Sequence, residues 1–125
     1  MFNKVHHIAV ICTDYEKAKH FYIDLLGFSV IAENYREQTK DYKIDLVCGI
    51  VQIELFIKPD APKRVSSPEA CGLRHLAFHV DDVEKTVNEL KSKGIDCEEV
   101  RLDTFTGKKM TFFRDPDLLP IEIHE

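Results

Sequence analysis

The sequence predicts an α+β domain built from two successive modules, each with the order strand, helix and three further strands. The first observation behind this prediction is an internal repeat. The segment HIAVICTDYEK at 7–17 returns without a gap as HLAFHVDDVEK at 75–85, an offset of 68 residues. The second observation is that in each copy an apolar, strand-like stretch runs into acidic residues and then a helical pattern. The chain therefore repeats one supersecondary unit.

Glycines predict where the helix of each module ends. The first helix is expected to run to about Leu26, just before Gly27, and the second to about Lys93, just before Gly94. Glycine suits the left-handed position that follows many helices. The helix starts offer alternative N-caps, which are Thr13 with Glu16 or else Asp14, and Asp81 with Glu84 or else Asp82.

The remaining strands follow these glycines. They are expected near 28–35, 43–48 and 50–57 in the first module and near 95–101, 107–114 and 119–124 in the second. The stretch 58–71 holds three prolines and is predicted to link the modules 1–57 and 72–125 within one domain, 1–125. A turn is expected at Asp115-Pro116-Asp117, before the last strand.

Composition excludes several classes of protein. The chain has 125 residues, enough for one domain with a real core, and its formal net charge of −5 leaves no basic stripe for nucleic acid. No export signal and no run of about 18 apolar residues is visible, so we expect a cytoplasmic protein without a membrane partner. The four cysteines lie too far apart for a CxxC pair and are expected to be reduced: Cys12, Cys48, Cys71 and Cys97.

One carboxylate breaks the apolar strand VQIELFIK at 51–58. Because side chains alternate along a strand, Glu54 shares a face with Gln52 and Phe56, opposite the aliphatic residues. A sheet with one wet face would look the same. Adding the offset of 68 residues leads to Glu122, however, which again lies between isoleucines. The repeat therefore carries a glutamate on its last strand as well as a histidine on its first.

The histidines at the start of the repeat are His7 and His75. If a pseudo-twofold axis relates the modules, these imidazoles and the two glutamates can converge on it. Two imidazoles and two carboxylates suit a divalent ion such as Ni, Zn, Co, Mn or Fe. Two carboxylates on one wall without a cation would be costly, since both would lose water and repel each other. The alternative is a polar sheet face on which the repetition is coincidental.

Other polar and aromatic residues are candidates for binding a substrate. His79 shares the inward face with His75 and is predicted to line a pocket rather than to bind metal, and Phe56 shares its face with Glu54. Arginines that could hold an anionic substrate are Arg36, Arg64, Arg74 and Arg101. The expected partner is a small molecule.

The paired HIAV and HLAF strands, the IEL and IEI strands, the FYIDLLGF helix end and the DPD turn resemble the vicinal oxygen chelate superfamily, in particular glyoxalase I-like proteins. The resemblance covers essentially the whole chain. It implies two βαβββ modules whose mixed sheet curves around a metal site. The implied metal ligands are His7, Glu54, His75 and Glu122, and the implied assembly is a homodimer whose sites take ligands from both chains.

The resemblance also implies an activity. In glyoxalase I a divalent ion acts as a Lewis acid that stabilises an enediolate while a ligand glutamate moves the proton. Here the candidate bases are Glu122, which is preferred, and Glu54. The expected function is thus a metal-dependent lyase or isomerase of lactoylglutathione lyase type, acting on a hemithioacetal of a 2-oxoaldehyde or a similar oxygen-bearing molecule.

Three departures from glyoxalase I concern glutathione and the turn. Ile11 stands where an arginine usually holds a glutathione carboxylate, and Lys58 where an asparagine stands. Leu118 replaces the glycine that usually follows the DPD turn. The sequence therefore supports the inference of a metal site more strongly than it supports glutathione as the thiol. Alternatives of the same fold are a fosfomycin-type thiol transferase, an extradiol-type dioxygenase and a non-catalytic drug-binding resistance protein of bleomycin type.

Overall fold

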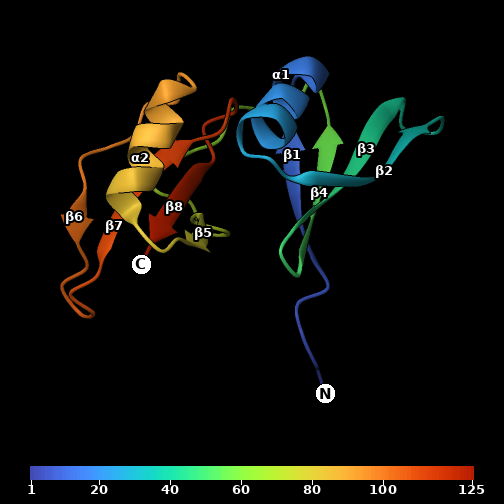
Figure 1. Ribbon diagram of the computed structural model, residues 1–125. Coiled ribbons are helices and arrows are strands. Elements are labelled where there is room, and N and C mark those ends of the chain that lie inside the picture. Colours follow the sequence, from blue (N-terminus) through green and yellow to red (C-terminus); the bar gives the residue numbers. More distant parts are fainter. The chain divides into compact units, whose positions relative to one another are not determined.

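Each of two units of the chain carries a four-stranded mixed sheet. The computed structural model describes all residues, 1–125, and divides them into the units Met1–Pro62 and Lys63–Glu125. The division falls inside 58–71, the segment predicted to link the modules. Figure 1 shows that each unit combines its sheet with helical structure. No helix is long and apolar enough to cross a membrane.

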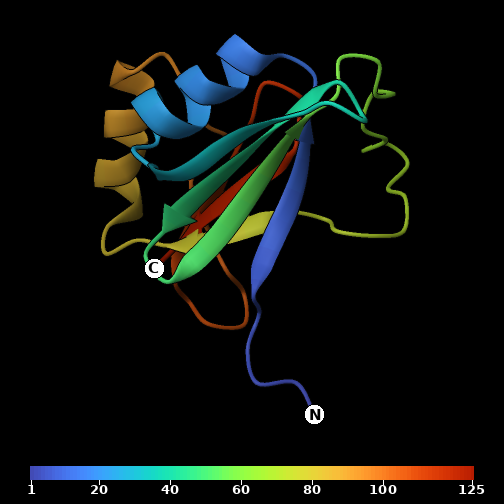
Figure 2. The same cartoon turned by 90° about the vertical axis from the view of Figure 1, so that its right-hand side faces the viewer.

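In the first unit the first and last strands lie side by side. The elements are β1 (His7–Cys12), α1 (Tyr15–Lys19), the π-helical turn η1 (His20–Leu25), β2 (Ser29–Arg36), β3 (Asp41–Cys48) and β4 (Val51–Ile57). The strand order is β1-β4-β3-β2, with β1 parallel to β4 and the other pairs antiparallel. Figure 2 shows β1, in blue, running alongside β4, in light green.

The second unit has the same topology. Its elements are β5 (Leu76–His79), α2 (Val83–Ser92), β6 (Arg101–Leu102), β7 (Lys109–Arg114) and β8 (Pro120–His124). The strand order is β5-β8-β7-β6, and β5 is parallel to β8. The predicted α+β fold of two tandem βαβββ modules is confirmed, and each module has a sheet of its own.

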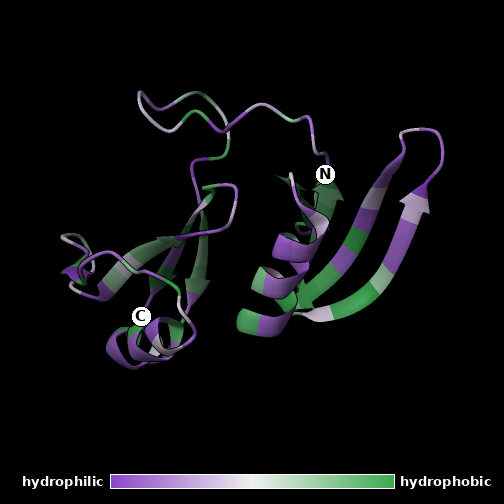
Figure 3. Cartoon of the chain, turned by 90° about the horizontal axis from the view of Figure 1, so that it is seen from above, coloured by the Kyte–Doolittle hydropathy of each residue, from purple (hydrophilic) through white to green (hydrophobic).

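Alternation along the strands separates a core face from a polar face. In β4, Ile53 and Leu55 are fully buried, as Cys12 of β1 is, and η1 contributes the buried Phe21 and Tyr22. Figure 3 shows strands whose colour changes between hydrophilic purple and hydrophobic green along their length. The opposite face of β4 carries Glu54, so the core also fixes the direction in which this carboxylate points.

The helix starts decide between the alternative caps. Asp14 and Asp82 are the N-caps, and their side chains accept hydrogen bonds from the backbone N–H groups of Lys17 and Lys85. Glycine follows each helical segment in the left-handed region, with φ of 76° at Gly27 and 81° at Gly94, as predicted. The first helix departs from expectation because its second half, η1, is π-helical.

The strand predicted near 95–101 is wrong for most of its length, since only Arg101 and Leu102 form β6. The preceding stretch runs beside β7 without a regular ladder. The N–H of Glu98 donates to the carbonyl of Phe112 at 2.8 Å, and the Thr111 hydroxyl donates to the carbonyls of Glu98 and Glu99 at 2.9 and 3.3 Å. A side-chain hydroxyl thus binds the backbone of this stretch beside β7, a contact that hydrophobic alternation does not reveal.

The turn before β8 places a leucine in the left-handed region. Leu118 has φ of 69° and is exposed, and the Asp115 carboxylate accepts from the N–H groups of Asp117 and Leu119. For a residue with a Cβ this conformation costs about 1–2 kcal/mol. The turn thus keeps its geometry although leucine stands at the glycine position.

We expect Leu118→Gly to raise the free energy of unfolding. The strain energy relieved in the folded state is larger than the entropic stabilisation that glycine gives the unfolded chain. The net gain in unfolding free energy is about 0.5–1 kcal/mol. Urea denaturation measures it. Leu73→Gly is the control, because Leu73 is also exposed but has no positive φ, and this change should lower stability. A loss of stability in both variants would contradict the prediction.

Asp41 ties the edge of the first sheet together. Arg36 donates to its two carboxylate oxygens from Nε at 2.7 Å and from Nη2 at 2.6 Å, Lys58 Nζ lies 2.8 Å away, and the Thr39 hydroxyl donates at 2.7 Å. Arg36, followed by Lys58 and Thr39, holds the pKa of the Asp41 carboxyl well below its usual range. Lys58, which stands where glyoxalase I usually has an asparagine, is thus bound to Asp41 in this fold.

We expect Asp41→Asn to lower the free energy of unfolding at neutral pH and to make this free energy less dependent on pH in the acidic range. A depressed folded-state pKa stabilises the fold above the unfolded carboxyl pKa of about 4, and this contribution is lost as pH falls through the folded pKa. The gap in urea midpoint between wild type and variant should therefore shrink below pH 4. The exposed Asp24, changed to Asn, serves as the control. An equal gap at every pH would contradict the prediction.

Candidate metal and substrate site

Each unit brings one predicted imidazole next to one predicted carboxylate. In the first unit His7 Nε2 lies 3.6 Å from Glu54 Oε2, and in the second His75 Nε2 lies 2.9 Å from Glu122 Oε2. The parallel pairing explains both contacts. His7 is in register with Gln52 of β4, two residues before Glu54, and β5, which follows His75, pairs with β8 in the same way. Residues 47 positions apart in the sequence thus meet on one face.

The two carboxylates are buried although each has few partners. Glu54 is 7% exposed and Glu122 is 8% exposed. A buried carboxylate is costly unless it is paired or binds a metal. No group of three or more histidine, cysteine, aspartate or glutamate side chains suited to a metal gathers within either unit. Each unit therefore presents one imidazole beside one carboxylate, and their role as metal ligands and the convergence of all four side chains stay predictions.

The spacing within each pair fits ligands of one divalent ion. Nitrogen and oxygen ligands lie about 2.1 Å from such ions, so two of them are roughly 3.0 Å apart at a right angle and roughly 3.4 Å apart at a tetrahedral angle. The separations of 2.9 and 3.6 Å lie close to this range. Imidazole nitrogen and carboxylate oxygen are also the donor types that Zn, Ni, Co, Mn and Fe accept.

The surroundings of the two glutamates differ. Glu54 faces Asp45 across the strand pair, and Lys43 Nζ lies 3.0 Å from Glu54 Oε1 and 2.7 Å from Asp45. The amide of Gln52 donates to the same Glu54 oxygen at 3.3 Å. One oxygen of Glu54 is thus held by Lys43 and Gln52, while the other faces His7.

Glu122 instead faces an aromatic ring. Its cross-strand neighbour is Phe112, and its only ion-pair or hydrogen-bond partner is His75. The rings of His75 and Phe112 meet edge to face, with centroids 5.3 Å apart.

Lys43 and Phe112 were not predicted as site residues. Their inward parity on the strands before Glu54 and Glu122 was a usable signal, since cross-strand neighbours on one face touch.

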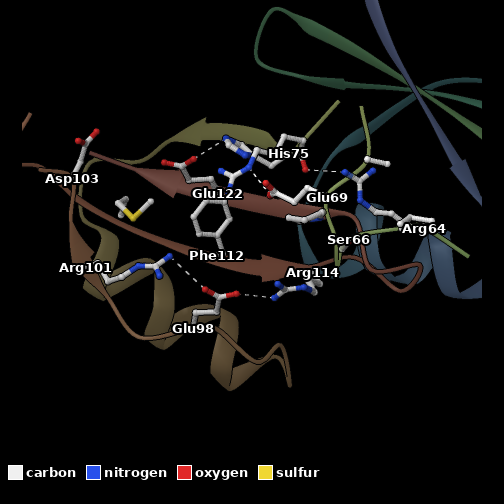
Figure 4. A pocket seen from close by; sticks show the side chains of 15 residues that line it. Arg64, Ser66, Glu69, His75, Glu98, Arg101, Asp103, Phe112, Arg114 and Glu122 are labelled. Atoms are coloured by element: carbon white, nitrogen blue, oxygen red, sulfur yellow. Dashed lines mark hydrogen bonds and ion pairs between the residues drawn. The ribbon is translucent and has the colours of Figure 1, made fainter. Parts of the chain in front are cut away.

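The second unit has a pocket of about 560 Å³ beside His75 and Glu122. Phe112, Met110 and Pro120 contribute apolar surface, and four arginines also line it: Arg64, Arg74, Arg101 and Arg114. Figure 4 shows Phe112 between the Glu122 and His75 pair on one side and Arg101, Glu98 and Arg114 on the other. Besides Phe112, neither Glu98 nor Arg114 was predicted from the sequence.

The predicted substrate-binding residues have different surroundings. Phe56 is half-buried with the Arg36 guanidinium over its ring at 4.8 Å, and Arg36 is also bound to Asp41. His79 is exposed at the end of β5 and does not line the pocket. Arg36 is therefore engaged by the protein, whereas Arg101 faces the pocket.

The fold, with an imidazole beside a carboxylate in each module, is that of the vicinal oxygen chelate class. A family model of the Glyoxalase/Bleomycin resistance protein/Dioxygenase superfamily matches residues 4–123, and the chain belongs to this superfamily. Over 126 residues it is 55% identical to YwkD of Bacillus subtilis (strain 168), covering 100% of this chain and 98% of that one. It is 53% identical to YaeR of Escherichia coli (strain K12), covering 98% and 95%.

Solved structures and more distant relatives agree with this membership. A glyoxalase family protein from Enterococcus faecalis has a TM-score of 0.95 and 49% identity, covering 99% of this chain and 98% of that one. Human mitochondrial methylmalonyl-CoA epimerase is 28% identical over 120 residues, covering 91% and 68% of the two chains. The metallothiol transferase FosB of Staphylococcus saprophyticus is 23% identical, covering 99% and 78%.

Proposed function

We propose that the protein is a metal-dependent enzyme of glyoxalase type that moves a proton at a carbon next to an oxygen-bearing carbon of a small substrate. The observation that carries the proposal is the repeated pairing of an imidazole with a buried carboxylate at the spacing of ligands of one ion. His7, Glu54, His75 and Glu122 would hold the divalent ion. When bound, such an ion supplies Lewis-acid stabilisation of negative charge on substrate oxygens.

The chain's own residues divide the work unequally. Lys43 and Gln52 hold one oxygen of Glu54, which favours a fixed ligand role for this carboxylate. Glu122 has no lysine partner and lies beside the apolar ring of Phe112, so its carboxylate is freer to turn toward a substrate. We therefore assign to Glu122 the removal of the proton from one substrate carbon and its return to the neighbouring carbon.

Two distant relatives support different candidate reactions. An epimerase inverts the configuration at a carbon, which calls for removal and return of a proton, as the proposed reaction does. The similarity to FosB supports a second candidate, transfer of a thiol to a small molecule by a metal-dependent transferase. That reaction would need two histidines and one glutamate as metal ligands, and would leave Glu54 without a required role.

We further propose a cytoplasmic homodimer, in keeping with the family resemblance. Each site would take ligands from both chains. Light scattering measures the mass in solution, and a mass of one chain at all concentrations would remove this part of the proposal.

The test of the proposed function has two steps. Reconstitution with Ni, Zn, Co, Mn or Fe should leave about one divalent ion per chain, and no bound ion in the wild type would remove the enzyme assignment. The loaded protein is then given methylglyoxal with glutathione and afterwards with other small thiols, and product formation is followed by absorbance. Absence of turnover with every thiol would discard the glyoxalase-type substrate, while addition of a thiol to fosfomycin would favour the transferase.

A further inference from the structure

The four arginines of the pocket in the second unit differ in how far the protein engages them. Arg64 Nη2 donates to the carbonyls of Leu73 and Arg74 at 2.6 and 2.9 Å, just before His75, so Arg64 fixes the backbone that leads to the imidazole. Arg74 extends into solvent with 67% of its side chain exposed and pairs with Glu69 at 2.6 Å. Both arginines thus have protein partners at one edge of the pocket.

Arg101 and Arg114 share one carboxylate. Arg114 Nη1 lies 2.8 Å from Glu98 Oε1, and Arg101 Nη2 lies 3.4 Å from Glu98 Oε2. No other acceptor binds either guanidinium. A guanidinium has five N–H donors, so most of these donors lack a protein partner, and two positive charges face one negative charge. The Arg101 guanidinium also lies over the Phe112 ring, 5.7 Å from its centroid.

The position of this pair relative to the proposed reacting end is set by the sheet. Glu122 on β8, Phe112 on β7 and Arg101 on β6 follow one another across paired strands, and Arg114 shares the β7 face with Phe112 (Figure 4). The Phe112 ring therefore separates the pair of Glu122 and His75 from two guanidinium groups, most of whose N–H donors lack a protein partner. A small molecule lying along this ring would contact the carboxylate and imidazole at one end and the guanidinium groups at the other.

We propose that Arg101 and Arg114 form a subsite for a carboxylate of the substrate, at the opposite side of Phe112 from Glu122. The Glu98 carboxylate already occupies one edge of this pair, which shows that a planar group with two oxygens suits the two guanidinium groups. The substrate class is thus a small acid whose carboxylate lies away from its reacting carbon. The inference rests on the proposed function for the identity of the reacting end.

The main experiment compares acids that differ in one group. Metal-loaded protein is titrated by calorimetry with oxaloacetate, 2-oxoglutarate and 2-oxoadipate, and with the monoacids 2-oxobutanoate, 2-oxopentanoate and 2-oxohexanoate. Each diacid is compared with the monoacid of the same chain length. The two share the 2-oxo acid end, and the diacid has a carboxylate where the monoacid has a terminal methyl group. At the chain length that fits, the diacid should bind roughly tenfold or more tightly than its monoacid, as expected for charge-assisted hydrogen bonds. Equal affinities at all three lengths would overturn the proposal.

The variants separate a specific subsite from general charge. Arg101→Met with Arg114→Met should reduce the preference for the diacid to less than about threefold. Arg74→Met is the control, because it removes one positive charge from the same pocket, against two in the double variant, and should keep the preference. An equal loss in Arg74→Met would overturn the assignment. All three side chains are at least 44% exposed, so the variants are expected to fold, and their urea midpoints check this.

A second measurement works without metal and keeps the two proposals distinguishable. In chelator-treated protein, acetate should shift the Nε–H signals of Arg101 and Arg114 in nuclear magnetic resonance spectra and leave that of Arg74 unchanged. Such shifts support the subsite even if no ion binds and the proposed function fails. Unchanged Arg101 and Arg114 signals would overturn the subsite alone. Methylphosphonate acting at tenfold lower concentration than acetate would overturn the choice of a carboxylate.

Discussion

Replacing His75 by alanine is expected to lower the affinity for a divalent ion by at least about 100-fold, because even partners of metal ligands contribute 10- to 100-fold. His75 Nε2 is the sole polar partner of Glu122, so the variant also leaves that buried carboxylate alone. Competition with a chelating dye measures the affinity. In the wild type, an ion at about 100 times its dissociation constant should add roughly 2.7 kcal/mol to the unfolding free energy, and the variant should lose most of this gain.

The control for His75→Ala is His20→Ala. His20 lies on η1 with 64% of its side chain exposed and pairs with Asp24, so its loss removes an imidazole without touching the proposed site. This variant should bind the ion as the wild type does. Unchanged affinity in His75→Ala, with the fold intact by circular dichroism, would contradict the proposed ligand set.

Glu122→Gln is expected to reduce the exchange of a substrate C–H with deuterated solvent by about 10²- to 10⁴-fold, the usual contribution of a positioned base. The amide cannot accept the proton as the carboxylate does, but its oxygen can still bind an ion, so the metal affinity should fall less than in His75→Ala. Nuclear magnetic resonance follows the exchange in the hemithioacetal of methylglyoxal, at a metal concentration that saturates each variant.

The matched variant is Glu54→Gln, which makes the same change at the pseudo-equivalent position. Because Lys43 and Gln52 hold the Glu54 carboxylate, we expect this variant to lose metal affinity but to retain most of the exchange once saturated. The reverse order, with slower exchange in Glu54→Gln than in Glu122→Gln, would transfer the role of base to Glu54.

The repeat made most of the fold predictable, because strands, glycines and acidic residues recur at one offset. The parity of Ile53 and Leu55 identified the core face of β4 and therefore the direction of Glu54. The repeat paired His7 with Glu54, but it does not state which strands are neighbours. That they touch follows from the parallel pairing of β1 with β4.

Features that depend on side-chain competition were not predictable in this way. The Thr111 hydroxyl binds the carbonyl of Glu98 where a strand was expected, and the cap falls on Asp14 although Thr13 also fits the pattern. Lys43 reaches Glu54 from a neighbouring strand, and Glu98 reaches Arg114 from a segment without regular structure. Such contacts require the strand order and the rotamers, which no linear spacing contains.

The parallel pairing of the outer strands has a consequence for folding kinetics. Since β1 hydrogen-bonds to β4, the last strand of its unit, this pairing must wait until the whole intervening segment has been synthesised and its loop entropy has been overcome. The hairpin β3–β4 is local by comparison and is free to form early. In pulse-labelled hydrogen exchange, the amides of β1 should therefore gain protection late, and the approach of His7 to Glu54 should mark the completion of the unit.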